Sequence, residues 1–372
     1  MKMEIVEKDF SSFYNVPFEV RGKNSLYAAP FKPDLKKMLS IQNPIFKSEN
    51  DFTFYTLLKD GRLAGRISVQ IHHDFNRKFK VRKCYFGFFE CINDQEAADK
   101  LFGLAEAFAL KHNCDVLTGN FNLTAMQEMG VMTGGFENEP YILQSYGMPY
   151  YPNLLEKAGF RATFPMSTFE IDLLAAEPEK ILTEKQKALL NDKEYEIIPI
   201  TKKAYPKLAP VILDIFNRGF DMNPLFVPLT REEFDFQAKD LVYFMDSSIS
   251  FLALHKGVPV GLSIHIPDMN PVLRACNGEL NLKTLFYFIM SKIKRDRTLC
   301  VFSAVLPEYQ KQGVLGAIVY KSLTAMKARG YKRLGITWVS ESNAGSMKKM
   351  KDTGARKLHD LRIFEKLLKT PG

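Results

Sequence analysis

The sequence predicts an α/β protein built from two similar units in tandem. Its 372 residues exceed the length of an average domain and suggest two of them. Two pairs of segments resemble each other at almost the same spacing along the chain. Within each half, strand-like apolar stretches alternate with helix-like stretches, an order that implies helical crossovers between parallel strands.

The internal duplication is visible at two widely separated places. The stretch FYTLLKDGRLAGRISV resembles FLALHKGVPVGLSIHI, and Gly65 then aligns with Gly261, 196 positions later. The stretch LLEKAGFRATFPMSTFEIDL resembles KMKDTGARKLHDLRIFEKLL, and Gly159 aligns with Gly354, 195 positions later. Two matches at nearly one offset predict a repeated unit of somewhat under 200 residues.

Each unit has the same predicted order of elements. An opening strand and helix precede a hairpin whose turn is KDG in the first unit and HKG in the second. An apolar strand, an amphipathic helix, a further strand, a helix ending in Gly and a last strand follow. The central helix of the first unit begins after Asn93 or Asp94, either of which is a good N-cap. Its counterpart runs from about Gly316 to Gly330, a C′ glycine.

The two units differ by one insertion each. Aligning Asn113 with Gly330 changes the offset to 217, so the second unit has about 21 additional residues before this point and the first about 22 after it. The insertion of the second unit contains LKTLFYFIM. We predict that this stretch forms a buried helix, and the alternative is that it lines an acyl channel. The charged stretch 175–195 is predicted to be a linker or exposed helix. The units therefore span 1–174 and 196–372.

Charge and cysteine content limit the function classes. The chain has 51 Lys and Arg against 42 Asp and Glu, a net charge of +9, which suits an anionic ligand such as a nucleotide. No basic run is interleaved with aromatic residues, so nucleic acid is not the expected partner. Five cysteines without a C-x-x-C pair indicate reduced thiols in a cytoplasmic protein. No spacing indicates a metal site, and we expect no membrane partner.

A glycine-bearing turn is the strongest candidate site. In SAVLPEYQKQGVLGAIVYKS, a predicted strand passes through a turn into a helix, a junction that is also common without any ligand. Backbone amides of such a turn, with the positive end of the helix dipole, can bind a pyrophosphate. A side chain at Gly313 would obstruct the phosphate oxygens. The expected cofactor-binding residues are Val305, Gln310, Lys311, Gln312, Gly313, Val314, Leu315 and Gly316.

This turn resembles the acyl-CoA-binding segment of the GNAT N-acetyltransferase superfamily. The superfamily pattern is [Gln/Arg]-x-x-Gly-x-[Gly/Ala], to which Gln310 and Gly313 correspond. Leu315 stands where a small residue is expected, and Gly316 falls one place late. Asn343 belongs to a second matching signature, WVSESNAGSMKKMKDTG, in which a strand, Glu-x-Asn and a helix ending in Gly follow one another. The resemblance adds Asn343 to the cofactor-binding residues.

Almost the whole chain resembles an uncharacterised bacterial family of tandem GNAT-like proteins. The resemblance implies two GNAT-like domains, each a mixed central sheet flanked by helices. We expect one cofactor site, in the C-terminal domain, because the N-terminal domain has CINDQEAADK where the other has YQKQGVLGAI. That turn lacks glycine, and Asp94 and Glu96 would repel phosphates. The N-terminal insertion either shapes the acceptor pocket or is a surface loop.

The resemblance further implies acyl transfer from acetyl-CoA or a longer acyl-CoA to a small amine or amino-acid-like acceptor. The cofactor arm is expected between the strands CVFSAVL and LGITWVSES. Glu341 is the candidate catalytic residue, with capping of the following helix as its structural alternative. Met350 stands where many GNAT enzymes place a tyrosine that protonates the leaving thiolate. An aminoacyl transferase using aminoacyl-tRNA and a non-catalytic ligand-binding protein are the alternatives.

Overall fold

The computed structural model describes residues 2–22 and 25–368, without the side chains of 239–241 and 292. The first unit contains β1 (Met3–Glu7), α1 (Phe10–Arg21), α2 (Lys32–Met38), β2 (Phe52–Lys59), β3 (Arg62–Ile71), α3 (His73–Phe79), β4 (Lys83–Cys91), α4 (Gln95–Lys111), β5 (Val116–Gly119), β6 (Val131–Gly134), α5 (Tyr151–Lys157) and β7 (Arg161–Asp172).

The second unit repeats this order after a linker. Residues 175–195 contain a short 3-10 turn and α6 (Glu184–Asn191), which is mostly exposed. The remaining elements are β8 (Tyr195–Pro199), α7 (Tyr205–Phe220), α8 (Arg231–Phe244), β9 (Phe251–His255), β10 (Val258–Pro267), α9 (Asn270–Cys276), α10 (Leu282–Lys294), β11 (Arg297–Val305), α11 (Val314–Ala328), β12 (Arg333–Ser340), α12 (Ala344–Asp352) and β13 (Arg356–Leu367).

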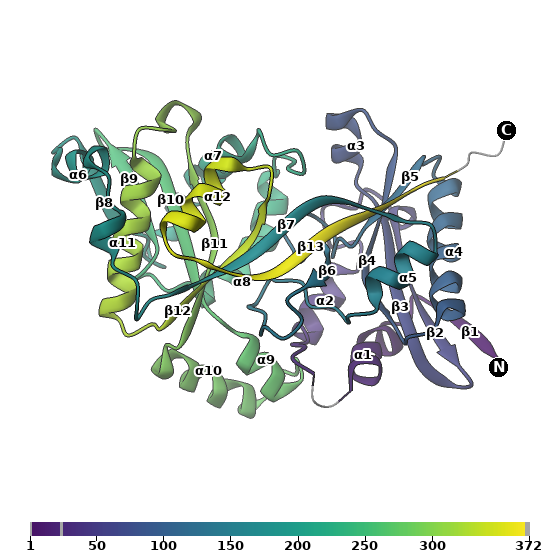
Figure 1. The fold of residues 1–372 in the computed structure, drawn as a ribbon. Helices are drawn as coiled ribbons and strands as arrows, with labels where there is room; N and C mark the ends of the chain where they lie inside the picture. Colours follow the sequence, from purple (N-terminus) through teal and green to yellow (C-terminus); the bar gives the residue numbers. More distant parts are fainter. Residues whose placement is uncertain (1, 23–24, 369–372) are drawn as a thin grey trace.

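One mixed sheet runs through both units. The strand order is β1-β2-β3-β4-β5-β13-β7-β12-β11-β10-β9-β8, with β6 paired to β13 beside this path. Among the strands of the described residues, only β4 with β5 and β11 with β12 pair in parallel, at equivalent places of the two units. Each parallel pair is connected through a long helix, α4 or α11, because a parallel crossover needs one. Figure 1 shows these units at opposite ends of the molecule.

The last strands of the two units are exchanged. β13, which ends the second unit in sequence, pairs with β5 and β6 of the first. β7, which ends the first unit, pairs with β12 of the second. β7 and β13 also pair with each other and cross the middle of the molecule (Figure 1). The sheet therefore does not divide between the ranges 1–174 and 196–372, and the assignment of these ranges to two domains stays a prediction.

Equivalent glycines close equivalent helices. Gly159 after α5 has φ +90° and Gly354 after α12 has φ +67°, a left-handed conformation that only glycine adopts without strain. Gly330 ends α11 in the same way, with φ +84°. The predicted pairing of Gly159 with Gly354 thus marks one turn that occurs twice in the fold.

The insertions occupy different places. In the first unit, the residues between β5 and α5 add β6 and long loops that turn toward the second unit. In the second unit, α10 is added between α9 and β11. The predicted burial of LKTLFYFIM is wrong, because Leu282 is 86% exposed and Phe286 is 60% exposed. Thr284 and Phe288 face the protein instead.

Candidate functional site

The parallel strands of the second unit separate partway along their length. β11 and β12 pair from Arg297 and Arg333 only as far as Cys300 and Ile336. Beyond this point β12 continues along β7, up to the pair Ser340 and Met166. β11 continues along β10 instead. The separation, which we call the splay, leaves the edge of β11 beyond Cys300 without a partner strand.

The predicted glycine turn follows β11 directly. Val305 is the buried last residue of the strand, and α11 begins at Val314 behind Gly313, whose φ is +95°. The amides of Gln310 and Gln312 donate to carbonyls within the turn, at 3.2 and 3.4 Å. In the described part of the chain, the four amides of 313–316 donate to no acceptor. They are the free N–H groups of a helix N-terminus.

The linker helix α6 lies against this turn. Lys185 donates from Nζ to the carbonyl of Lys311 at 2.7 Å. Gln186 fills the space beside Gly316, where an added Cβ would come within 1.9 Å of Gln186 Nε2. Gly316 therefore accommodates α6, which brings two side-chain donors next to the free amides. The assignment of the turn residues to cofactor binding stays a prediction.

Glu341 and Asn343 have separate roles in the structure. Asn343 caps α12, because its Oδ1 accepts from the amide of Ser346 at 3.0 Å. The predicted alternative for Glu341, capping of this helix, is therefore wrong. Glu341 lies 3.6 Å from Arg362 and accepts from Ser167 at 3.4 Å, which ties it to β7 and β13. Its catalytic role stays a prediction.

A polar cluster lies next to the splay, and the sequence indicated two of its members, His265 and Ser303, as weaker catalytic candidates than Glu341. The hydroxyls of Ser263 and Ser303 share a hydrogen bond of 2.5 Å, on neighbouring strands β10 and β11. Cys300 Sγ lies 3.3 Å from Ser303 Oγ, and His265 Nε2 lies 3.3 Å from Ser263 Oγ. The register shift between β10 and β11 beside Cys300 brings Cys300 and Ser303 to one face.

Lys349 of α12 adds a cation to this cluster. Its side chain is largely buried, and burial lowers the pKa of its ammonium to about 8. The nearby Cys300 acts in the opposite direction and raises this pKa. No described group pairs with the Lys349 ammonium. Burial also raises the pKa of the Cys300 thiol and lowers that of His265 to about 3, so both are neutral at pH 7.

The equivalent splay of the first unit is filled by its own chain. β4 and β5 pair only as far as Tyr85 and Thr118. Beyond this point Asn122 Oδ1 accepts from the amide of Phe88 at 2.7 Å, and the amide of Phe121 donates to Phe86. Gly87 lets this loop approach, because an added Cβ would lie 1.9 Å from the Phe121 carbonyl. The insertion thus satisfies the edge of β4 in the first unit. The equivalent edge of β11 in the second unit stays open.

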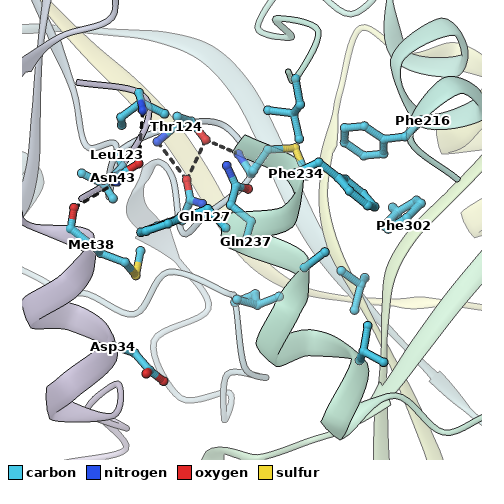
Figure 2. Close-up of a pocket in the computed structure, with 18 of the residues that line it drawn as sticks. Asp34, Met38, Asn43, Leu123, Thr124, Gln127, Phe216, Phe234, Gln237 and Phe302 are labelled. Carbon is cyan, nitrogen blue, oxygen red and sulfur yellow. Dashed lines mark hydrogen bonds between the residues drawn. The ribbon is translucent and has the colours of Figure 1, made fainter. Parts of the chain in front are cut away.

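An apolar pocket of about 250 Å³ lies between the two units and reaches the splay. Figure 2 shows Met38, Leu123 and Gln127 of the first unit facing Phe234 and Phe302 of the second. Thr124 and Gln127 hold the inserted loop through a hydrogen bond of 2.6 Å. The lining includes Asp34, Lys37, Met38, Ile45, Leu123, Met126, Leu143, Tyr205, Phe216, Phe234, Ala238, Met245, Ile264, Val301 and Phe302.

Among the described residues, no group of three or more His, Cys, Asp and Glu side chains could hold a metal ion. Within the same part of the chain, none of the helices combines the length and apolar character needed to cross a membrane.

Known proteins resemble the chain in sequence. Residues 221–354 match the acetyltransferase (GNAT) family. Protein YghO of Escherichia coli is 24% identical over 373 residues, which cover 97% of this chain and 93% of that protein. A protein of Caulobacter vibrioides named bacterial ceramide synthase is 22% identical over 367 residues, which cover 97% of this chain and 95% of that protein.

Solved structures share the arrangement of the whole chain. A tandem GNAT protein from the clavulanic acid biosynthesis pathway has a TM-score of 0.60 at 10% identity, with all of both chains covered. A GCN5-related N-acetyltransferase from Sphaerobacter thermophilus has a TM-score of 0.57 at 12% identity, covering 100% of this chain and 96% of the other. These likenesses confirm the predicted fold, two GNAT-like units in tandem.

Proposed function

We propose that this chain, which has the fold of the tandem GNAT-like proteins, transfers an acyl group from acyl-CoA to the amine of a molecule with a long apolar chain. The observation that carries the proposal is the apolar pocket that borders β11 where this strand leaves β12. Such a lining favours hydrocarbon over a polar acceptor. The name of one relative, bacterial ceramide synthase, fits this chemistry, because a ceramide is an amide of a fatty acid and a long-chain amino alcohol.

The site fits the predicted co-substrate at two places. Bound acyl-CoA supplies an activated acyl group and a thiol as leaving group. The free amides of 313–316 and the Lys185 ammonium would hold its diphosphate, since both present donors at the N-terminus of α11. The open edge of β11 beyond Cys300 would pair with the amides of its pantetheine arm. These contacts suit acetyl-CoA and longer acyl-CoA alike.

Lys349 is our candidate for the group that protonates the leaving thiolate, since Met350 stands where many GNAT enzymes have a tyrosine for this role. During transfer the amine nitrogen forms the amide bond, the carbon–sulfur bond breaks, and the thiolate takes a proton from Lys349 Nζ. The amine loses its own proton to solvent, from which Lys349 is recharged. A pKa of about 8 suits this role near neutral pH. We place the acid here and not at Glu341, whose carboxylate lies beside Arg362.

The proposal is tested with the purified full chain in two steps. Thermal unfolding is followed with CoA, acetyl-CoA and long-chain acyl-CoA, and a bound ligand should raise the melting temperature. Thiol release is then measured with short amines, amino acids and an eighteen-carbon amino alcohol. We expect release with the long-chain amine. A thermal shift without release from any amine would favour the ligand-binding alternative. Retardation of tRNA without any shift by CoA would favour the aminoacyl-tRNA alternative.

A variant that narrows the pocket separates chain recognition from chemistry. Met126 lines the pocket on the inserted loop, so Met126→Trp should exclude part of an apolar chain. We expect the KM for the long-chain amine to rise about tenfold, since the exclusion of two methylenes loses about 0.8 kcal/mol of binding free energy for each. The control is Met222→Trp, at a side chain that is 94% exposed. An equal loss with a short amine would contradict a role in recognising the chain.

A further inference from the structure

The inserted helix α10 turns its apolar face away from the protein. Its outward residues recur at helical spacing and are between 50% and 86% exposed. Scattered exposed apolar residues are ordinary, whereas a continuous face of this kind marks an interaction site. In Figure 1, α10 lies on the outside of the molecule beside α9. The face consists of Leu282, Leu285, Phe286, Ile289 and Ile293.

Contacts on the opposite side fix this orientation. Asn281 caps the helix, accepting from the amide of Thr284 at 3.1 Å, and Thr284 donates back to the carbonyl of Glu279 at 2.5 Å. The ring of Phe288 packs on Phe244 of α8 at a centroid distance of 5.6 Å. Because this side is bound to the protein, the apolar face has no described neighbour to cover it.

The charge on α10 complements an anionic surface. The helix LKTLFYFIMSKIK contains three lysines and no acidic residue, and Arg295 follows it. The acidic residues nearest in sequence are already paired, Glu279 with Lys32 at 3.4 Å and Asp296 with Lys332 at 2.6 Å. An apolar face flanked by lysines is the pattern of helices that lie in the interface of a membrane.

We propose that α10 docks the protein on the surface of a membrane that contains anionic lipids. The apolar face would enter the boundary between headgroups and acyl chains, and the lysines would contact lipid phosphates. This occupant is favoured over a second copy of the chain, since paired α10 helices would bring like charges together. The proposal departs from the sequence-based expectation of no membrane partner.

Docking would bring the membrane close to the apolar pocket. Phe244, which contacts α10 through Phe288, also stacks on Phe31 at a centroid distance of 6.5 Å. Its neighbours in sequence, Val242 and Met245, line the pocket. This link to the long-chain amine rests on the proposed function, whereas the docking itself does not.

The test is co-sedimentation of the full chain with vesicles of phosphatidylcholine alone and of phosphatidylcholine with phosphatidylglycerol. We expect binding that needs phosphatidylglycerol and weakens with salt. The double variant Phe286→Ser and Ile289→Ser should lower binding at least about tenfold, because two apolar side chains would no longer enter the membrane. The matched control is Met222→Ser, at an exposed side chain outside the face.

Two further measurements separate the possible failures. Sedimentation velocity reports whether the wild type self-associates; self-association that the double variant abolishes, without vesicle binding, would assign α10 to a contact between copies and overturn the proposal. Equal binding to both kinds of vesicle would overturn the role of the charges. Thiol release with a soluble amine should be the same in the double variant and wild type. Its absence in both proteins would count against the proposed chemistry alone.

Discussion

Lys349 illustrates how burial changes the chemistry of one ordinary residue. A lysine in a polar helix is normally charged and solvated, with a pKa near 10.4. Lys349 is held beside Cys300 at the splay, where removal of water lowers the pKa of its ammonium to about 8. A shifted group in such a position is typical of functional sites, although it costs stability while it is charged.

We predict that Lys349→Met lowers the rate of thiol release about a hundredfold or more, the usual contribution of a general acid. In the wild type the rate should fall as the pH rises above about 8, because the ammonium then loses its proton. This alkaline decline should disappear in the variant. The control is Lys348→Met. Lys348 is the exposed neighbour of Lys349 and pairs with Asp352 at 2.7 Å. A pH profile unchanged in Lys349→Met would refute the assignment.

The same substitution should affect stability in the opposite direction. The folded-state pKa of Lys349 lies below its unfolded value, so between about pH 8 and 10 the unfolded chain binds more protons. This group therefore makes the wild type more stable as the pH rises through that window. Lys349→Met should have the higher free energy of unfolding at pH 7, and the difference should shrink by pH 10. Denaturant unfolding at both pH values measures it.

Gly313 and Gly330 allow backbone strain to be separated from cofactor binding. They stand at the two ends of α11 with φ of +95° and +84°, so alanine at either costs about 1–2 kcal/mol of stability. Only Gly313 adjoins the free amides of the turn. We predict that Gly313→Ala removes most of the thermal shift caused by CoA, whereas Gly330→Ala keeps it. Equal loss in both variants would trace the effect to strain.

For single residues, the sequence predicted backbone conformation better than the groups that carry the proposed chemistry. Gly159, Gly330 and Gly354 were placed correctly, because a helix that ends in left-handed backbone needs glycine. The Asp94 cap of α4 was one of two predicted options, and it accepts from Glu96 at 3.0 Å. Lys349 could not be found, because its burial depends on where β11 and β12 separate.

Single elements show why the two units differ in their sites. The loop after β5 inserts asparagine side chains into the splay between β4 and β5 of the first unit. The equivalent splay between β11 and β12 stays open in the second unit. Asn122 accepts from Phe88 and donates to Glu128 at 2.8 Å, and burial raises the pKa of the Glu128 carboxyl. The proposed single cofactor site in the second unit agrees with this filling.

We predict that Asn122→Ala destabilises the protein by about 1–3 kcal/mol, because the buried amide of Phe88 then loses its acceptor. The thermal shift caused by CoA should remain, since this loop is remote from the glycine turn in sequence and lies in the other unit. The control is Asn50→Ala, at an exposed residue. A variant that lost the CoA-induced shift at normal stability would contradict a single site in the second unit.

The sequence pattern predicted the helix α10 but not which of its sides faces the protein. Its existence followed from the apolar spacing of LKTLFYFIM, but the same spacing describes a helix that faces a core and one that faces a partner. Which side is covered was decided by Thr284 and Phe288, whose contacts lie on α8 and on residues before the helix. Those contacts are tertiary and leave no periodic trace in the sequence.

For the whole molecule, the repeat was predictable and the strand exchange was not. Similar segments at offsets of 196 and 195 reveal two units, because each copy keeps its own hydrophobic pattern. That pattern is the same whether β13 pairs within its own unit or with β5 of the other. The pocket between the units likewise follows from their docking, so the sequence indicated only which insertion could shape it.

The exchange makes each unit depend on the other for its sheet. Without β13, the first unit would expose the edge of β5, and without β7 the second would expose the edge of β12. We therefore predict that fragments 1–177 and 178–372, expressed separately, aggregate or stay unfolded. Expressed together, they should copurify through a tag on one fragment and show a single thermal transition close to that of the intact chain. Fragments that were each stable monomers would refute the dependence, because native pairing of β7 and β13 leaves neither unit complete alone.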